Sequence, residues 1–144
     1  MSGYWKDAEK TAKTMTKDGW LRTGDMGYMD EDGYVFLAGR GDDMIIRGGE
    51  NISPEEVENA LYAHPAVEEV AVIGVADPEW GQEPMAIVAL KKGENATAEE
   101  LMEFCRERLA SFKRPRSVVF VDTLPRTSTG KILKRTLREQ YGQP

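Results

Sequence analysis

A short hydroxyl-rich segment near the C-terminus ends in a lysine that is suited to anion chemistry. Thr127-Ser128-Thr129-Gly130-Lys131 lies between a predicted strand and a predicted helix. A phosphate-binding P-loop, GxxxxGK[ST], also connects a strand to a helix. The P-loop is excluded because Pro125 replaces its leading glycine and because Ile132, after the lysine, cannot bind magnesium. What remains is a loop that could bring the ammonium group of Lys131 to an anionic substrate.

Two segments in the first third of the chain combine glycine with charged residues. They are Arg22-Thr23-Gly24-Asp25 and Gly39-Arg40-Gly41-Asp42-Asp43. A carboxylate after a glycine turn can accept both hydroxyls of a ribose, and a nearby arginine can pair with a phosphate. Taken singly, each segment would more often be an acidic turn in a surface loop. Together they are more informative, and they point to a nucleotide.

Four motifs in a fixed order carry a resemblance to a known family. The chain resembles the last part of the adenylate-forming superfamily, which includes acyl- and aryl-CoA ligases, luciferases and peptide-synthetase adenylation domains. The resemblance runs from Tyr4 to about Leu137, which is nearly the whole chain. The motifs are Arg22-Thr23-Gly24-Asp25, Gly39-Arg40-Gly41-Asp42-Asp43-Met44-Ile45, Gly48-Gly49-Glu50-Asn51-Ile52-Ser53-Pro54 and Pro125-Arg126-Thr127-Ser128-Thr129-Gly130-Lys131.

The resemblance implies a fragment of an ATP-dependent acid–CoA ligase, which forms an acyl-adenylate and then an acyl-CoA. Asp25 matches the ribose-binding aspartate of the family, and Arg40 matches an arginine that contacts the nucleotide. Lys131 matches the catalytic lysine that reaches the substrate carboxylate and the α-phosphate. Mg²⁺ is expected on the pyrophosphate leaving group. ATP, AMP and Mg²⁺ would be bound mainly by a missing N-terminal domain, and no metal ligand is expected in this chain.

The resemblance assigns a different face to the transfer of the acyl group to CoA. A glycine-rich strand at Gly48-Gly49-Glu50 would leave room for the narrow pantetheine arm. Trp80, Phe112 and Arg114 match positions that hold the CoA nucleotide, by aromatic stacking and by pairing with phosphate. Some relatives carry a lysine in the glycine-rich strand, whereas this chain has Ile45-Ile46-Arg47. No catalyst of the second step is therefore assigned.

The resemblance also divides the chain into two parts. Residues 1–41 would be the tail of the large adenylate-binding domain, Asp42 the hinge, and residues 42–144 the mobile C-terminal domain. In the first part, the pattern from Met26 to Leu37 predicts a β-hairpin around an acidic turn at residues 30–33. The first 40 residues lack a core of their own and read as a stub cut from the missing domain.

From about residue 42, strands and helices alternate in a way that predicts an α+β fold, a small mixed β-sheet flanked by helices. Ser53 and Thr97 are predicted to cap helices. Strands are predicted at 44–46, 70–75, 85–90 and 118–121, and a final helix over 131–141. In that helix Leu137 should face inward and the basic residues Lys134, Arg135 and Arg138 outward. Cys105 lies on an apolar helix face and is predicted to be a core residue.

Composition indicates a globular protein with an uneven charge. The chain is 40% hydrophobic and 31% charged, with a net charge of −6. No apolar run reaches the roughly 18 residues of a membrane span. The single cysteine and the absence of a signal-like start indicate a cytoplasmic location. Residues 106–138 hold 10 Lys and Arg against 2 Asp and Glu, which indicates an anionic partner or a solvated basic face.

Two other functions stay open. A non-enzymatic interaction module could dock an anionic partner on its basic surface, although this gives no reason for the Asp25 and Arg40 motifs, and nucleic acid is not expected. An adenylating domain could instead serve a carrier-protein thiol, although Trp80, Phe112 and Arg114 favour CoA. The carboxylic acid is expected to be a fatty acid or an aryl acid. The isolated fragment is expected to be inactive and could form a homodimer.

Overall fold

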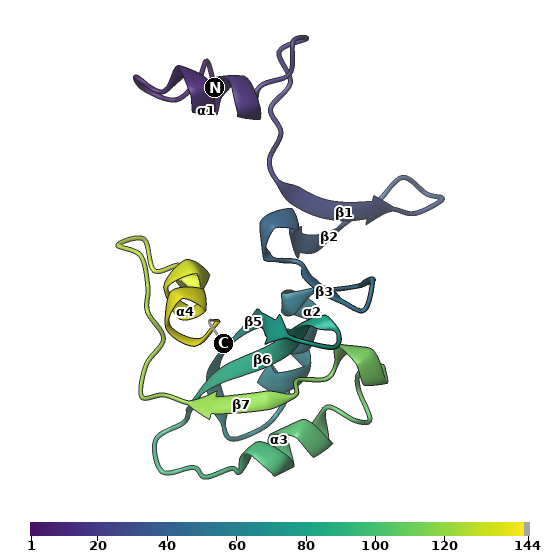
Figure 1. Ribbon diagram of the computed structural model, residues 1–144, viewed down its shortest axis with the longest axis vertical. Coiled ribbons are helices and arrows are strands. Elements are labelled where there is room, and N and C mark those ends of the chain that lie inside the picture. Colours follow the sequence, from purple (N-terminus) through teal and green to yellow (C-terminus); the bar gives the residue numbers. More distant parts are fainter. Residues whose placement is uncertain (143–144) are drawn as a thin grey trace. The chain divides into compact units, whose positions relative to one another are not determined.

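The computed structural model describes residues 1–142, which divide into two compact units (Figure 1). The first unit comprises residues 1–42, and the second begins at Asp43. In the described range, no helix is both long enough and apolar enough to cross a membrane.

The first unit consists of one short helix and one hairpin. Helix α1 (Ala8–Thr14) is followed by the antiparallel strands β1 (Asp25–Met29) and β2 (Val35–Arg40). In the predicted acidic turn, the Asp30 carboxylate accepts the backbone N–H groups of Asp32 at 3.1 Å and Tyr34 at 2.8 Å. None of residues 1–42 is buried, so this unit has no core of its own.

The second unit is built on a mixed sheet of five strands. The sheet was predicted, and it is confirmed. The central strand β6 pairs with β5 along one edge and with β3 and β7 along the other, and only β7 runs parallel to it. Strand β4 extends the sheet beyond β3. The strands are β3 (Ile45–Arg47), β4 (Glu50–Ile52), β5 (Val67–Asp77), β6 (Gly81–Leu90) and β7 (Ser117–Phe120).

Helices cover both faces of this sheet because β5 and β6 send alternate side chains to opposite sides. On one face, Val70 and Val72 of β5 join a core that includes residues of α2 (Pro54–Tyr62) and α3 (Ala98–Phe104). On the other face, Ala71 and Ile73 meet Leu137 of α4 (Lys134–Tyr141). Two short 3₁₀ turns, η1 (Gly41–Asp43) and η2 (Ser111–Lys113), complete the elements.

The predicted helix starts are confirmed. The Ser53 hydroxyl accepts the N–H of Glu56 at 3.4 Å and begins α2. Thr97 and Glu100 form a reciprocal capping box at the start of α3, with hydrogen bonds of 3.2 and 2.8 Å. A cap of this kind satisfies N–H groups that the first helical turn leaves without intrahelical partners.

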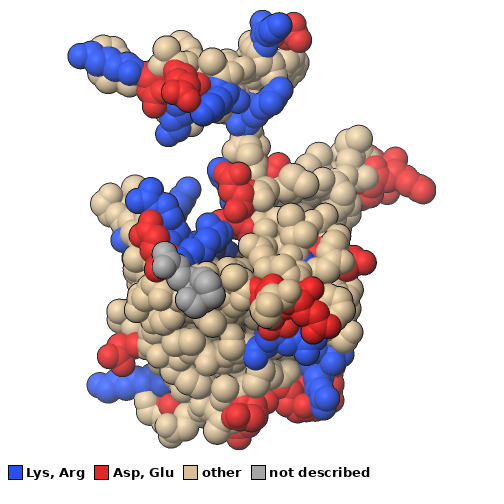
Figure 2. Space-filling model, in the orientation of Figure 1, with Lys and Arg blue, Asp and Glu red and all other residues tan. Residues whose placement is uncertain are grey.

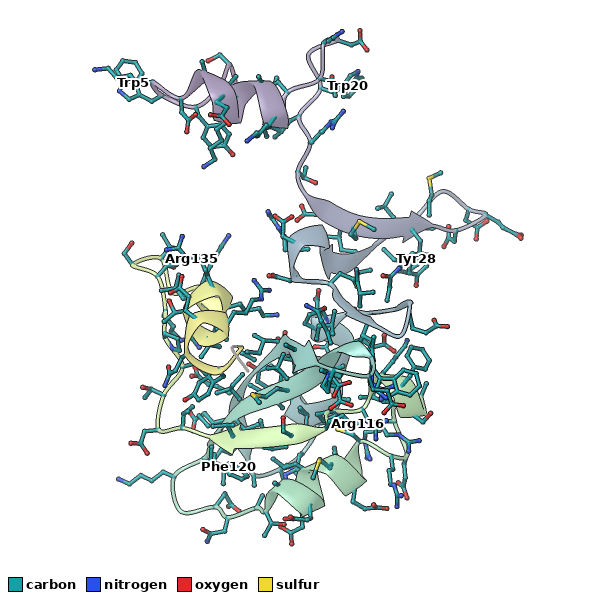
Figure 3. All side chains as sticks on the ribbon, in the orientation of Figure 1. Trp5, Trp20, Tyr28, Arg116, Phe120 and Arg135 are labelled. Carbon is teal, nitrogen blue, oxygen red and sulfur yellow. The ribbon has the colours of Figure 1, made fainter. Side chains whose placement is uncertain are left out.

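Several element predictions were wrong. Helix α1 and strand β4 were not predicted, and the last helix begins at Lys134 instead of Lys131 because the preceding residues close a hairpin. Lys134 and Arg138 were expected to face outward, but both turn toward carboxylates of the same unit. Arg135 does project outward, as Figure 3 shows.

Cys105 is fully buried, as predicted, and its thiol should be unreactive in the folded chain. Burial raises the pKa of the Cys105 thiol to about 11, so about one thiol in 10⁴ is ionised at pH 7. We expect iodoacetamide to label the native chain at least about 100-fold more slowly than a free cysteine and to label it fully in urea, as measured by mass spectrometry. Cys105→Ser is the control that should not label in either state. Labelling of the native chain at the rate of free cysteine would contradict the buried position.

Candidate functional site

Lys131 lies at the end of a closed hairpin loop. A β-bridge joins Arg126 to Ile132 and closes the base of this loop. Within it, the N–H of Thr127 donates to the carbonyl of Lys131 at 2.7 Å, and the N–H of Gly130 donates to the carbonyl of Thr127 at 2.9 Å. Gly130 has φ +85°, a backbone conformation that glycine adopts without strain. The loop is therefore a defined turn that fixes the backbone of the lysine.

Polar side chains hold the same loop in place. The Thr127 hydroxyl accepts the backbone N–H of Lys131 at 3.1 Å. The Arg126 guanidinium donates to the carbonyl of Gly130 and forms an ion pair with Glu69 on β5. Arg126 thus ties the loop to the sheet. These contacts do not involve the side chain of Lys131, which stays exposed to solvent.

The exposed ammonium group of Lys131 forms no ion pair within the described part of the chain, which sets it apart from its neighbours. Arg114 and Arg116 donate to backbone carbonyls. The basic and acidic side chains lie beside one another on the surface (Figure 2). The other seven basic residues between 106 and 138 pair with carboxylates: Arg106–Glu103, Arg108–Glu107, Lys113–Glu56, Arg126–Glu69, Lys134–Glu58, Arg135–Glu139 and Arg138–Asp43.

A half-buried ion pair fixes the passage from this loop into α4. Lys134 Nζ lies 2.7 Å from Glu58 Oε1 on α2, and the same oxygen accepts the N–H of Val72 on β5 at 2.7 Å. Burial raises the pKa of Glu58 and outweighs the opposing effects of Lys134 and of the Val72 N–H. One helical turn further on, Arg138 pairs with Asp43. Neither the Arg126 contact nor the Glu58 contact was predicted, because each joins residues far apart in the sequence.

In the first unit, the two residues predicted to bind the nucleotide lie together. Asp25 and Arg40 are direct partners in the β1–β2 register, and their side chains form an ion pair of 3.4 Å. Gly24 has φ +79°, and a Cβ at this position would lie 3.0 Å from the Arg40 guanidinium. Gly24 therefore allows the arginine to lie across the turn that precedes the aspartate.

The residue predicted as a hinge is the last residue of the first unit. Asp42 lies within the 3₁₀ turn η1, and the next residue, Asp43, begins the second unit. Each unit is compact in itself, and the role of Asp42 as a hinge stays a prediction.

The glycine-rich segment is a turn, and its prediction as a strand was wrong. Gly48 and Gly49 connect β3 to β4 and have φ +56° and +88°, as a two-residue turn of a β-hairpin requires. A Cβ on Gly48 would lie 2.8 Å from the ring of Trp80, whereas a Cβ on Gly49 would meet nothing within 4 Å. The space above Gly48 is thus filled by the chain's own indole, and Gly49 and the exposed Glu50 stay accessible.

The other residues predicted to bind CoA have clear structural contacts. Trp80 lies over the β3–β4 hairpin and stays 41% exposed. Phe112 is half-buried and packs against the core beneath α2 and α3. Arg114 donates to the carbonyls of Leu109 at 3.0 Å and Arg106 at 3.2 Å. Together with Arg106 and Arg116, Arg114 also lines a surface pocket of about 390 Å³.

An α+β domain that displays an unpaired lysine on a locked hairpin is consistent with the family resemblance, and comparison establishes the family. The chain matches the family described as "AMP-binding enzyme C-terminal domain" over residues 56–131 and belongs to it. The match ends at Lys131.

Named relatives of the chain are CoA ligases. It is 54% identical to a probable CoA ligase, CCL11, of Humulus lupulus over 96% of the chain and 25% of that protein. It is 50% identical to the mitochondrial medium-chain acyl-CoA ligase ACSF2 of Bos taurus, over 99% of the chain and 23% of that protein. The chain thus spans about a quarter of the length of these relatives.

A solved structure shows the same fold. The chain resembles an o-succinylbenzoate CoA synthetase (MenE) from Bacillus subtilis, solved in complex with the acyl-adenylate intermediate OSB-AMP. The TM-score is 0.89 and the identity 40%, over 96% of the chain and 28% of that structure.

The raised pKa of Glu58 makes a prediction about the stability of the second unit. A carboxyl group whose folded pKa is raised stabilises the fold in its protonated form, so its contribution is present below the usual value of 4.5 and is lost as the pH rises through the folded pKa. Glu58→Gln cannot ionise. We therefore expect the stability of the wild type relative to Glu58→Gln to fall as the pH rises from 4.5, as measured by urea denaturation at a series of pH values.

The exposed Glu68→Gln serves as the matched control for this measurement. If the stability of the wild type relative to Glu58→Gln instead rose with pH across the same window, the pairing with Lys134 would outweigh burial, contrary to our assignment.

Proposed function

We propose that this chain is the C-terminal part of an ATP-dependent acid–CoA ligase and that Lys131 serves the adenylation step. One observation carries the proposal: Lys131 is an unpaired cation on an ordered loop, in a segment where most other cations are paired within the chain. An unpaired ammonium group can interact with a substrate without first breaking an ion pair in the protein.

Adenylation brings two anions together, which explains the need for this lysine. The carboxylate of the acid attacks the α-phosphorus of ATP, a bond to the carboxylate oxygen forms, and pyrophosphate leaves. An ammonium group held between the carboxylate and the α-phosphate offsets their repulsion and the charge that develops in the transition state. The hairpin contacts of Thr127 and Arg126 keep the lysine backbone in place, so the reaction does not have to order it.

The nucleotide would be bound in part by the first unit, which we propose is the tail (residues 1–41) of the large adenylate-binding domain. Arg40 has the charge to contact the nucleotide, and Asp25 can accept the ribose hydroxyls. Their mutual ion pair of 3.4 Å is half-exposed, so exchanging it for a ligand costs little.

The thioester step would use residues 42–144 as a mobile domain that turns about Asp42. We place the pantetheine arm along the open side of Gly49 and Glu50, and the CoA nucleotide near Trp80, Phe112 and Arg114. Gly48 contributes by admitting Trp80. The relatives named above are CoA ligases, which favours CoA over a carrier-protein thiol and over a non-enzymatic docking module.

The acid substrate and the metal would belong to the upstream part of the intact protein. The acid is a fatty acid or an aryl acid in our proposal. In residues 1–142, no three His, Cys, Asp or Glu residues are arranged to hold a metal ion. In our proposal Mg²⁺ would be bound by the upstream domain together with ATP. A cytoplasmic location of the intact protein remains a prediction.

Lys131→Ala in the intact ligase tests the adenylation role. We expect the rate of adenylate formation, measured by exchange of labelled pyrophosphate into ATP, to fall by on the order of 10² to 10³. Transfer from a supplied acyl-adenylate to CoA should be nearly unchanged, because the lysine serves only the first step. The exposed Lys92→Ala is the matched control. Unchanged adenylate formation by Lys131→Ala would refute the proposal, as would ligase turnover by the 144-residue chain alone.

The hairpin of the first unit should make the isolated chain self-associate. Its apolar side chains include Phe36 and Tyr28, whose rings stack 5.1 Å apart, and Tyr28 projects from the hairpin in Figure 3. In the intact ligase they would be covered by the rest of the large domain. We expect sedimentation velocity to show a concentration-dependent dimer that Phe36→Glu reduces. The similarly exposed Phe120→Glu on β7 is the control. A monomer at all concentrations would refute this prediction.

A further inference from the structure

We propose that Arg47 is a positioning residue for the CoA-binding face: it holds the indole of Trp80 against the β3–β4 hairpin, so that a purine can stack on the ring. This inference rests on the proposed role of Trp80 in binding the nucleotide of CoA. It assigns a role to the arginine that lies just before the two glycines of the turn.

The guanidinium group of Arg47 lies over the ring of Trp80. Its Cζ is 4.7 Å from the ring centroid, within the range of a cation–π interaction. Nη2 of the same guanidinium lies 3.3 Å from the Glu83 carboxylate on β6. The Arg47 side chain is only 11% exposed, so little water screens either contact. Glu83 holds the guanidinium, and the guanidinium in turn faces the ring.

The backbone of Trp80 is fixed independently, which leaves the direction of the indole to Arg47. The N–H of Trp80 donates to the Asp77 carboxylate at 2.7 Å, and its carbonyl accepts the N–H of Gly48 at 2.8 Å. A Cβ on Gly48 would be only 2.8 Å from the indole, so the ring rests on the turn itself. The remaining 41% exposure of Trp80 offers a ring surface to a ligand.

The environment of Arg47 is a poor one for a residue that serves folding alone. Its Nε–H is buried and has no hydrogen-bond partner in the described part of the chain. A buried donor without an acceptor is unfavourable, and a methionine could fill the same space without one. Arg47→Met removes this unsatisfied donor but also leaves the Glu83 carboxylate, 24% exposed, without its partner, so the stability of the variant is measured beside its binding. What it should lose is the cation that holds the ring.

Titration of the ¹⁵N-labelled 144-residue chain with millimolar CoA, followed at the Trp80 indole N–H resonance, tests the proposal. Trp80→Phe assigns that resonance. We expect Arg47→Met to weaken CoA binding roughly 3- to 30-fold, the range of a cation–π contact at a half-exposed site. Arg47→Lys should be intermediate, because it keeps the charge but not the planar group. Binding of 4′-phosphopantetheine, which lacks the adenine, should be the same in all variants.

Arg108→Met is the matched control, because Arg108 lies 3.6 Å over the ring of Phe104 in the same unit, and it should bind CoA as the wild type does. Equal losses for CoA and phosphopantetheine, or a loss in Arg108→Met as large as in Arg47→Met, would overturn the inference. Normal CoA binding by Arg47→Met would overturn it while Trp80 kept its proposed role. If CoA does not shift the Trp80 resonance, both the CoA-binding role of Trp80 and the positioning role of Arg47 are refuted. The proposed adenylation role of Lys131 is unaffected by that result.

Discussion

The position of Lys131 depends on carboxylates that lie 57 to 95 residues before their basic partners. Glu58 binds Lys134 and the edge of β5 at once, Glu69 binds Arg126, and Asp43 binds Arg138. These contacts anchor the segment on both sides of Lys131 to α2, to the sheet and to the start of the second unit. The acidic body of the chain and its basic C-terminal segment thus neutralise each other. Most basic residues of the C-terminal segment form ion pairs within the chain, so only a few of them are available to a ligand.

The sequence predicted those features whose cause is local. The caps at Ser53 and Thr97, the acidic turn at Asp30 and the short, mostly apolar runs of β5 and β6 each need only a few neighbouring residues. Asp25 and Arg40 were predicted from the family resemblance, and the structure shows them opposite each other on the β1–β2 hairpin. Their role in binding the nucleotide stays a prediction.

Features that depend on distant partners could not be predicted in this way. The start of α4 was misplaced because Arg126 and Ile132 pair across a loop and so keep Lys131 out of the helix. The inward turn of Lys134 has no local signal, since its partner Glu58 is on another helix. Gly48 looked like room for a ligand, and only the structure shows that Trp80 takes this room. Strand β4 is three residues long and carries no alternating pattern of its own.

Strand β5 is apolar on both faces, since its alternate side chains enter two different cores. In a sheet with one solvent-exposed face, a register shift of one residue would move the apolar side chains from the core to the solvent and would be strongly destabilising. In β5, a slip of one residue would only move apolar side chains from one hydrophobic core to the other. The alignment of β5 must therefore be encoded by its few polar contacts, the Val72 amide that meets Glu58 and the Glu69 carboxylate that meets Arg126. The side chains that hold the lysine loop in place thus also set the register of strand β5.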